Sequence, residues 1–227
     1  MPARDRKINS PNAESPADDA PSPVSAERPR RTQAERRATA KRQLLLAALR
    51  LIAEKGVSRT TLAEIGEAAG YSRALPAAHF RDKTGLITAL WEYVLHLFAQ
   101  RSKRFAERRP GLDAVLGFAE IYLTRGDDDP YVFRASQILQ MEALTNAPEI
   151  RESVARHNHD AEGFLRRHIG IGIRQGEIRA EADPAAQAIM IIAMLRGALS
   201  HWVIDPKTDL EALRKEILAS LKRSLAP

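Results

Sequence analysis

Apolar residues recur at helical spacing within residues 60–80 and form two short groups. The first group lies three or four positions apart, as on one buried helix face, and consists of Leu62, Ile65, Ala68 and Ala69. Thr60 or Thr61 can cap this helix, and Gly70 suits the position just past its end, where φ is positive. Ser72 can cap a second helix that runs to Phe80. The pattern predicts a helix-turn-helix, a motif whose second helix enters the major groove of DNA.

The same period predicts helices on both sides of this pair. One runs from about Gln33 or Thr39 to Lys55, where Gly56 ends it. Its role would be packing, because a helix pair of this size cannot hold itself together. Phe80 would fill the small core between these helices, and a fourth helix is expected directly after it.

Residues 91–227 are predicted to form five or six helices. A capping Asp followed by Pro at the first helical position marks two helix starts, Asp129-Pro130 and Asp183-Pro184. Pro148 opens a long helix that should end near Gly176. The predicted fold class is therefore all-α, with an N-terminal three-helix helix-turn-helix domain and a C-terminal helical domain.

The helix after Pro184 is apolar on nearly all sides, which demands burial on more than one face. Its small residues Ala193, Gly197 and Ser200 fit close helix approach, either against a second copy of the chain or in an intrachain core. Residues 185–204 are also the best candidate for a membrane span. Polar residues interrupt them, however, and the longest apolar run is far shorter than the ~20 residues that a span needs. We therefore expect no membrane partner.

The formal charge of +6 is distributed unevenly along the chain. Residues 1–27 carry a net charge of −2, residues 28–90 carry +8, and residues 91–227 carry none. The whole excess thus lies on the segment with the helix-turn-helix pattern, as expected for a polyanion-binding module joined to a neutral domain. The chain has no Cys, which fits a reducing compartment, and residues 1–30 contain no apolar run typical of a signal peptide.

Three regions follow from these patterns. Residues 1–27 hold five prolines among small and polar residues, and we expect them to be disordered. Residues 28–85 combine a basic arm with the helix-turn-helix. The arm could lie along phosphates or reach into a minor groove, or it could be a solvated leader. Residues 86–227 form the helical remainder.

The run LLLAALRLIAEKGVSRTTLAEIGEAAGYSRALPAAHFRDKTGLITALWE closely resembles the N-terminal DNA-binding domain of the tetracycline-repressor (TetR) family of bacterial regulators. The resemblance covers about residues 39–95. It depends on features that coincide along this run, namely the Ala pair of the first helix, Gly56, the Thr pair, the run from Ile65 to Gly70, Ser72, the His79-Phe80 pair, Lys83 and Leu86. Residues 172–206 also look like the late helices of this family.

Members of this family are mostly dimeric repressors whose helical C-terminal domain binds a small molecule and thereby weakens operator binding. The resemblance implies a homodimer that binds double-stranded operator DNA, an effector of unknown identity, and a cytoplasmic, nucleoid-associated bacterial protein. Since a two-fold dimer presents two recognition helices, the operator should be an inverted repeat.

Family resemblance also assigns roles in DNA binding to single residues. Thr61 and Lys83 would meet phosphates, His79 would approach the DNA backbone, and Ser72 and Arg73 would start the recognition helix. Physical chemistry agrees, because Lys83 lies near a helix N-terminus that favours anions. Arg73 can make the bidentate contact that selects guanine. The full candidate set for DNA binding is Arg36, Arg37, Arg42, Thr60, Thr61, Ser72, Arg73, Ala74, Leu75, Ala77, His79 and Lys83.

The recognition helix departs from the usual family pattern. In place of the common Gly, Thr, Leu, Tyr and Arg, the positions before His79 are Ala74, Leu75, Pro76, Ala77 and Ala78. If Ser72 is the cap, Pro76 is the fourth helical residue, removes one early hydrogen bond and tightens the first turn. The Leu and Ala side chains can touch a thymine methyl group but cannot hydrogen-bond a base edge. Base discrimination should then depend on Arg73, methyl contacts, the basic arm and DNA shape.

A hypothetical effector pocket can be drawn from aromatic, amide and thioether side chains of the C-terminal domain. Such residues can line a pocket or simply form core. The candidates are Phe118, Tyr122, Phe133, Gln137, Met141 and Phe164.

A metal site is the opposing interpretation of the long helix. His157, Asp160 and His168 fall near one face of it, and Glu142 or Glu149 could complete the set. Without four convincing ligands we prefer a polar stripe and predict no metal and no cofactor. No nucleophile triad, phosphate-binding loop or metalloprotease motif occurs, so an enzyme is not expected. The function classes that remain are a ligand-responsive repressor, a dimeric small-molecule-binding or adaptor protein with weakened DNA binding, and a metalloenzyme.

Overall fold

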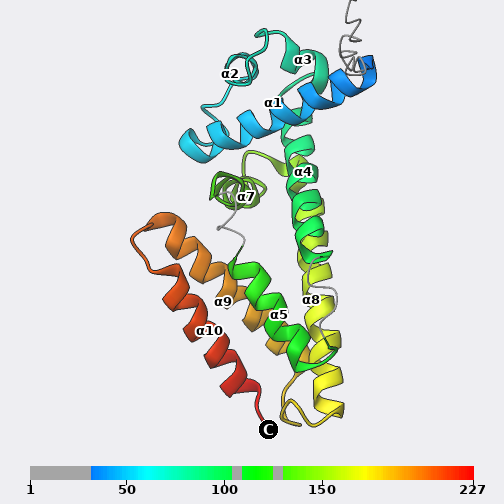
Figure 1. The fold of residues 1–227 in the computed structure, drawn as a ribbon, viewed down its shortest axis with the longest axis vertical. Helices are drawn as coiled ribbons and strands as arrows, with labels where there is room; N and C mark the ends of the chain where they lie inside the picture. The colour runs from blue at the N-terminus through cyan, green and yellow to red at the C-terminus, as the bar shows by residue number, and fades with distance from the viewer. Residues whose placement is uncertain (1–31, 104–108, 125–129) are drawn as a thin grey trace, which may run out of the picture.

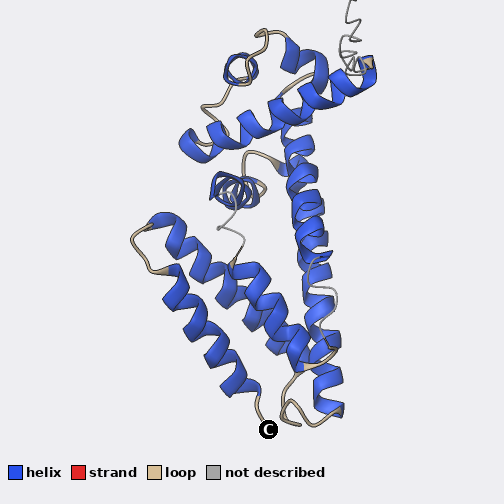
Figure 2. Cartoon of the chain, viewed as in Figure 1, coloured by secondary structure: helices blue, strands red, loops and turns tan. Residues whose placement is uncertain are grey.

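A computed structural model describes residues 32–103, 109–124 and 130–227, and all regular structure in these ranges is helical (Figures 1 and 2). The helices in chain order are α1 (Gln33–Lys55), α2 (Leu62–Ala68), α3 (Leu75–Phe80), α4 (Lys83–Lys103), α5 (Leu112–Leu123), α7 (Pro130–Glu142), the short 3-10 helix η1 (Pro148–Ile150), α8 (Arg151–Arg174), α9 (Pro184–Ile204) and α10 (Leu210–Leu225). The predicted all-α class is confirmed. The predicted tail at residues 1–27 and the first four residues of the arm lie outside the described residues.

Most predicted helix ends are confirmed by their caps. A capping box joins Thr32 and Glu35 at the start of α1, and Gly56, with φ of 82°, ends this helix. The side chain of Asp183 accepts a hydrogen bond from the backbone N–H of Ala185 at the start of α9, as predicted. The long helix predicted from Pro148 is divided into η1 and α8.

The turn between α2 and α3 is built by α2 and the glycine that follows it. Thr61 caps α2, and its side chain exchanges hydrogen bonds with Glu64 in a second capping box. After α2, Gly70 has φ of 76° and donates to the Glu67 carbonyl, while the next N–H donates to the Gly66 carbonyl. These two bonds form a Schellman motif, which requires the left-handed conformation that glycine adopts without strain.

The predicted start of α3 is wrong. This helix begins at Leu75 rather than directly after Ser72, and its N-cap, Ala74, makes no side-chain capping bond. Residues 72–75 form a turn in which the Leu75 N–H donates to the Ser72 carbonyl over 3.1 Å. Pro76 is consequently the second helical residue and not the fourth, so its missing N–H costs no helical hydrogen bond.

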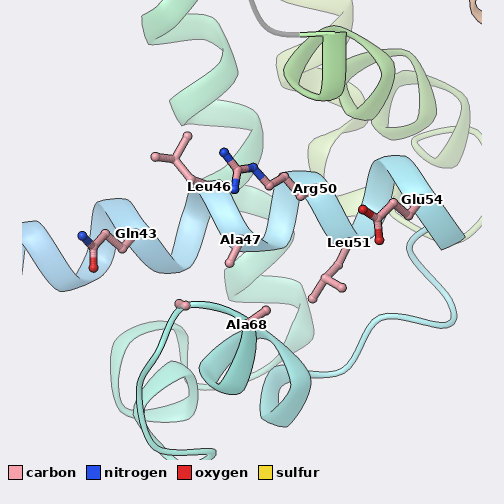
Figure 3. A pocket seen from close by; sticks show the side chains of 8 residues that line it. Gln43, Leu46, Ala47, Arg50, Leu51, Glu54 and Ala68 are labelled. Carbon is pink, nitrogen blue, oxygen red and sulfur yellow. The ribbon is translucent and has the colours of Figure 1, made fainter.

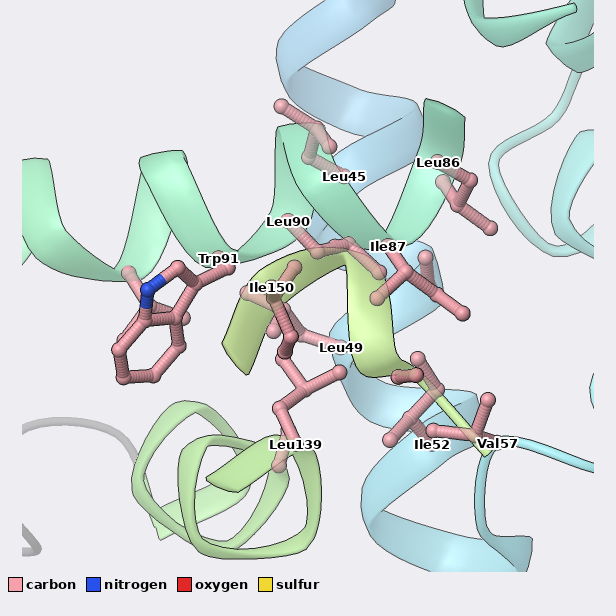
Figure 4. Packing of buried hydrophobic residues seen from close by; sticks show 14 of the residues in the cluster. Leu45, Leu49, Ile52, Val57, Leu86, Ile87, Leu90, Trp91, Leu139 and Ile150 are labelled. Carbon is pink, nitrogen blue, oxygen red and sulfur yellow. The ribbon is translucent and has the colours of Figure 1, made fainter. Parts of the chain in front are cut away.

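Buried side chains form two hydrophobic cores. The first core joins α1 and α4 to α7, η1 and the start of α8, and Phe80 lies in it as predicted. Figure 4 shows Leu49, Leu90, Leu139 and Ile150, which come from four different elements, packed together in this core. The second core joins α5, α8, α9 and α10, and α7 contributes Phe133 to it.

Helix α7 therefore lies between the two halves of the molecule. In Figure 1 it is seen end-on, below α1 and above the helices of the C-terminal half. Its residues Val132, Ala135 and Leu139 belong to the first core, as does Ala143 directly after it, whereas Phe133 belongs to the second. The connection between α4 and α8 is also direct, since Trp91 Nε1 donates to Ser153 Oγ over 3.2 Å.

Helix α9 keeps an apolar surface outside both cores. Ile189 and Met190 are 58% and 59% exposed, and Ile204 is 82% exposed. By length and composition alone, α9 is the one helix among the described residues that could cross a membrane. A core helix of a soluble protein meets the same criteria, so this finding does not change the expectation from the sequence.

Candidate functional site

A basic groove lies between the first turns of α1 and helix α3. The volume of this groove is about 570 Å³. The residues that line it are Gln33, Arg36, Arg37 and Ala40 from α1, with Leu75, Ala78 and His79 from α3. Partial burial, followed by the charges of Arg37 and Lys41, lowers the pKa of His79 below its usual value. The groove thus concentrates positive charge next to α3.

Most predicted DNA contacts on α3 and its preceding turn are accessible. Ser72, Arg73, Ala74 and Ala77 are exposed, and Leu75 is partly exposed. Methyl groups and one guanidinium therefore form the outer surface of this helix start.

An acidic neighbour holds Arg73. Its Nε lies 3.4 Å from Glu67 Oε1, in an ion pair whose two side chains are 71% and 52% exposed. An exposed ion pair of this kind contributes only ~0–1 kcal/mol. The guanidinium can therefore leave Glu67 at small cost.

The two neighbouring threonines have different surroundings. Thr60 is only 2% exposed, and its hydroxyl donates to the Gly56 carbonyl over 2.8 Å. This burial leaves its side chain no free surface for a phosphate. Thr61 is exposed, but its hydroxyl already donates to Glu64 Oε2 over 2.8 Å. The hydrogen bond from Lys55, together with those from Thr61, lowers the pKa of Glu64 to about 2.

Lys83 begins α4 and reaches back to the loop after α1. Its ammonium group donates to the Ser58 carbonyl over 3.1 Å. Asp82 caps the same helix by accepting from the Gly85 N–H. Lys83 keeps further N–H groups that can donate to a phosphate.

Arg42 does not join the basic groove. It is exposed on α1, but six positions after Arg36 place it about 120° away around the helix. Gln33 and Lys41, which are absent from the predicted set, do belong to this region. Helical spacing could have indicated Gln33, because it lies three and four positions before Arg36 and Arg37.

A second hollow, of about 470 Å³, lies between α1 and the end of α2. Figure 3 shows Leu46, Arg50, Glu54 and Ala68 around it. The Tyr71 hydroxyl donates to Gln43 Oε1 over 2.9 Å across the same side of α1. The turn before α3 is thereby tied to α1 at a distance from the basic groove.

The six effector candidates divide into two groups. Phe118 and Tyr122 from α5 lie near Phe164 from α8, with ring centroids 6.1 and 5.7 Å from that of Phe118. Gln137 and Met141 from α7 instead line a groove against α9.

Phe133 lies on the same side of α7 as Gln137 and Met141. It is fully buried, and its ring centroid is 6.3 Å from that of Trp202 of α9. The predicted pocket thus corresponds to two separate places, one at α5 and α8 and one between α7 and α9.

The histidines of α8 have separate environments. His157 packs near the rings of Trp91 and Phe98. His168 lies 4.4 Å, between ring centroids, from Phe164 and accepts a hydrogen bond from the Gly111 N–H. Burial, followed by the charge of Arg167, lowers the pKa of His168. Within the described ranges, no group of three or more His, Cys, Asp or Glu residues could hold a metal ion.

Comparison with known protein families gives two matches, one in each half of the chain. The family described as bacterial regulatory proteins, tetR family, matches residues 44–90, and the one described as tetracyclin repressor-like, C-terminal domain, matches residues 138–216. The regulator AcrR of Shigella flexneri is 35% identical, over 85% of this chain and 91% of its own. CymR of Pseudomonas putida is 33% identical, over 83% and 92%. The chain belongs to the TetR family.

Solved TetR-family structures share the fold. A regulator from Chloroflexus aurantiacus has a TM-score of 0.72 at 22% identity, covering 84% of this chain and 98% of that one. The SmeT–triclosan complex has a TM-score of 0.67 at 24% identity, with coverages of 83% and 92%. As a TetR-family member, the protein is a helix-turn-helix transcriptional regulator that binds DNA, in a family of ligand-binding repressors.

Proposed function

We propose that the protein is a dimeric repressor that binds an inverted-repeat operator through α3 and the first turns of α1. A small molecule in the C-terminal domain releases it from the operator, and it acts at the nucleoid in the bacterial cytoplasm. The observation that carries this proposal is the exposed start of α3 directly beside the basic groove with Arg36 and Arg37. A recognition helix and a source of phosphate contacts are thus on one surface.

Arg73 is the proposed base-reading residue, because it is the exposed side chain in the turn before α3 that can donate two parallel hydrogen bonds to guanine. Ser72, Ala74, Leu75 and Ala77 would contact methyl groups and sugar. A good bidentate contact discriminates bases by ~1–3 kcal/mol. This exceeds the ~0–1 kcal/mol of the exposed ion pair with Glu67. The Arg73 guanidinium should therefore leave Glu67 and bind the guanine.

The phosphate contacts of the proposal come from α1 and α4. Arg36, Arg37 and His79 surround the basic groove, and Lys83 stands at the start of α4. Each contact to a phosphate releases a counterion, so affinity should fall steeply with salt. Thr60 is not retained in this interface because it is buried.

A second copy of the chain is the proposed cover for α9. Ile189 and Met190 are large and exposed, and the exposed Ala193 and Gly197 on the same helix allow a partner helix to approach closely. Isolated soluble chains rarely leave contiguous apolar surface of this kind uncovered. A two-fold dimer would place two copies of α3 on one duplex.

The DNA-binding test uses fluorescence anisotropy with a labelled duplex from the DNA upstream of the gene. Arg73→Ala should weaken binding about 5- to 150-fold, the range that ~1–3 kcal/mol gives. Arg37→Ala should weaken binding to all sequences and reduce the salt slope by about one. Arg50→Ala, which changes an exposed Arg elsewhere on α1, serves as the matched control and should bind like the wild type. Binding without sequence preference at physiological salt would refute the proposal.

The dimer is tested by light scattering of the full chain. Gly197→Arg places a long charged side chain on the exposed face of α9 and should give a monomer with weaker operator binding. Ala212→Arg, on the exposed surface of α10, should remain dimeric. A wild-type chain that is monomeric at micromolar concentration would rule out the dimer.

The second candidate is a dimeric small-molecule-binding or adaptor protein with weakened DNA binding. It is favoured by the methyl-rich surface of α3, where Ala74 and Ala77 offer no hydrogen bond to a base. In that case Arg73→Ala would leave every measured activity unchanged.

A further inference from the structure

The turn between α3 and α4 holds Arg81 in a strained backbone conformation. Its φ is 69° and its ψ is −62°. The Asp82 N–H donates to the Phe80 carbonyl over 2.9 Å, which makes Arg81 the central residue of a γ-turn in its rare, strained form. The other described residues with positive φ are all glycines, namely Gly56, Gly70, Gly111 and Gly176. At position 81 the chain has an arginine where a glycine would be free of strain.

Contacts on both sides of Arg81 enforce this conformation. Phe80 before it is only 5% exposed and belongs to the first core. Asp82 after it caps α4, since its Oδ1 accepts from the Gly85 N–H over 2.8 Å. A Cβ atom at position 85 would lie 3.3 Å from the Phe80 carbonyl carbon and closer still to the carbonyl oxygen. The first turn of α4 therefore packs directly against the end of α3, and the turn cannot relax without moving one of these helices.

The side chain of Arg81 is free to bind a partner. It is exposed, and within the described ranges its guanidinium forms no hydrogen bond and no ion pair. His79 of the basic groove lies two positions before it, and Lys83 lies two positions after it. Both of these residues are proposed phosphate contacts. Arg81 thus adds an unpaired positive charge between them, at the end of the recognition helix.

We propose that Arg81 contacts a DNA phosphate at the end of α3, and that the strained turn holds its backbone in place for this contact. Strained residues persist where the surrounding structure enforces them, and they are concentrated at functional sites. A guanidinium keeps its charge at all physiological pH values and matches the geometry of a phosphate. The inference rests on the proposed function, because it requires α3 to lie on the duplex.

The phosphate contact is tested by fluorescence anisotropy with the operator duplex and with a duplex of unrelated sequence. Arg81→Ala should weaken binding to both duplexes to a similar extent and should reduce the salt slope by about one. The ratio of wild-type to variant affinity should then shrink about 3.5-fold between 50 and 200 mM salt. Arg81→Lys keeps the positive charge and should keep the slope. Arg50→Ala, which removes an exposed Arg elsewhere on α1, is the matched control and should also keep the slope.

The strain is tested by urea unfolding of Arg81→Gly and Arg81→Ala. Both variants lack the guanidinium and should show the same loss of salt slope, but only glycine adopts this backbone conformation without strain. The equilibrium constant for unfolding should therefore be at least about 2- to 5-fold smaller for Arg81→Gly than for Arg81→Ala. At position 50, inside α1, the order should be reversed, with Arg50→Gly unfolding about fivefold more readily than Arg50→Ala.

Each outcome bears on one step of the inference. A wild-type salt slope in Arg81→Ala would overturn the phosphate contact, even if the operator is bound specifically. The same order of stability at positions 81 and 50 would overturn the role of strain. A wild type that binds both duplexes equally would contradict the proposed function, whereas a reduced slope of Arg81→Ala on both would still support the phosphate contact.

Discussion

The position of Arg73 depends on the close approach between α2 and the turn before α3. The substitution Gly66→Ala tests this dependence. A Cβ atom at position 66 would lie 3.1 Å from the Ser72 carbonyl carbon and 3.2 Å from the Arg73 Cα, and closer still to the Ser72 carbonyl oxygen. All three atoms belong to the backbone, so no side chain can rotate out of the way. The turn must move outward for the methyl group to fit.

The expected energies follow from two opposing effects. Overpacking of a tight contact costs ~1–3 kcal/mol, whereas Ala favours the helix over Gly by ~1 kcal/mol. The net loss of stability should therefore be about 0–2 kcal/mol. The displaced turn carries Arg73, and loss of its base contact costs a further ~1–3 kcal/mol of binding, or about 5- to 150-fold in affinity.

Two assays separate these effects. Urea unfolding gives the change in stability, and anisotropy with the operator duplex gives the change in affinity. Ala68→Ser is the control, because it also adds one heavy atom to α2, but at an exposed position. It should change stability by less than ~1 kcal/mol. If Gly66→Ala kept wild-type stability and wild-type DNA affinity, the contact between α2 and the turn could not be what positions Arg73.

Four further predictions follow from single contacts. The hydrogen bond from Lys55 helps lower the pKa of Glu64 to about 2. Above pH 4.5 the melting temperature of the wild type should therefore exceed that of Glu64→Gln. This difference should shrink as the pH falls towards 2. Burial lowers the pKa of His79 below 6.5 in the folded protein, so the His79 imidazole binds a proton more readily in the unfolded chain. Urea unfolding should show that stability falls as the pH drops below 6.5. His79→Gln should lack this part of the fall. Pro76→Ala should lower the free energy of unfolding by at least ~0.4–1 kcal/mol, because Pro in the first turn restricts the unfolded chain and the buried Pro76 ring also loses packing. Leu139→Ala, at a fully buried position, should lower it by ~2–5 kcal/mol in the same assay.

Helix caps could be predicted from the sequence because they depend on neighbouring residues only. Thr61, Gly70 and Asp183 all have the predicted roles. The start of α3 could not be predicted in this way, because two local preferences conflict there. Ser72 favours an N-cap, but Pro76 is best tolerated within the first helical turn, and the structure follows the proline.

Contacts across turns and between distant helices are harder to predict from the sequence than helix caps. Glu67 and Arg73 belong to opposite sides of the turn, and no helical spacing relates them. Residue type marked Phe118, Phe133 and Phe164 as candidates for pocket lining or core, but it does not say which helix each one meets. The candidates therefore divide between the α5–α8 contact and the α7–α9 contact.

Charge and family resemblance divide the chain near Leu86. The first hydrophobic core, however, contains residues from both sides of that boundary. Leu86 and Leu90 of α4 pack with Leu139 of α7 and Ile150 of η1 in one core (Figure 4). The DNA-binding half therefore depends for part of its core on residues far along the chain. A rearrangement of α7 cannot remain confined to the C-terminal half, since it would expose or repack side chains that also hold α1. Helix α7 is thus already part of the core that holds α1, the helix that carries Arg36 and Arg37 of the basic groove.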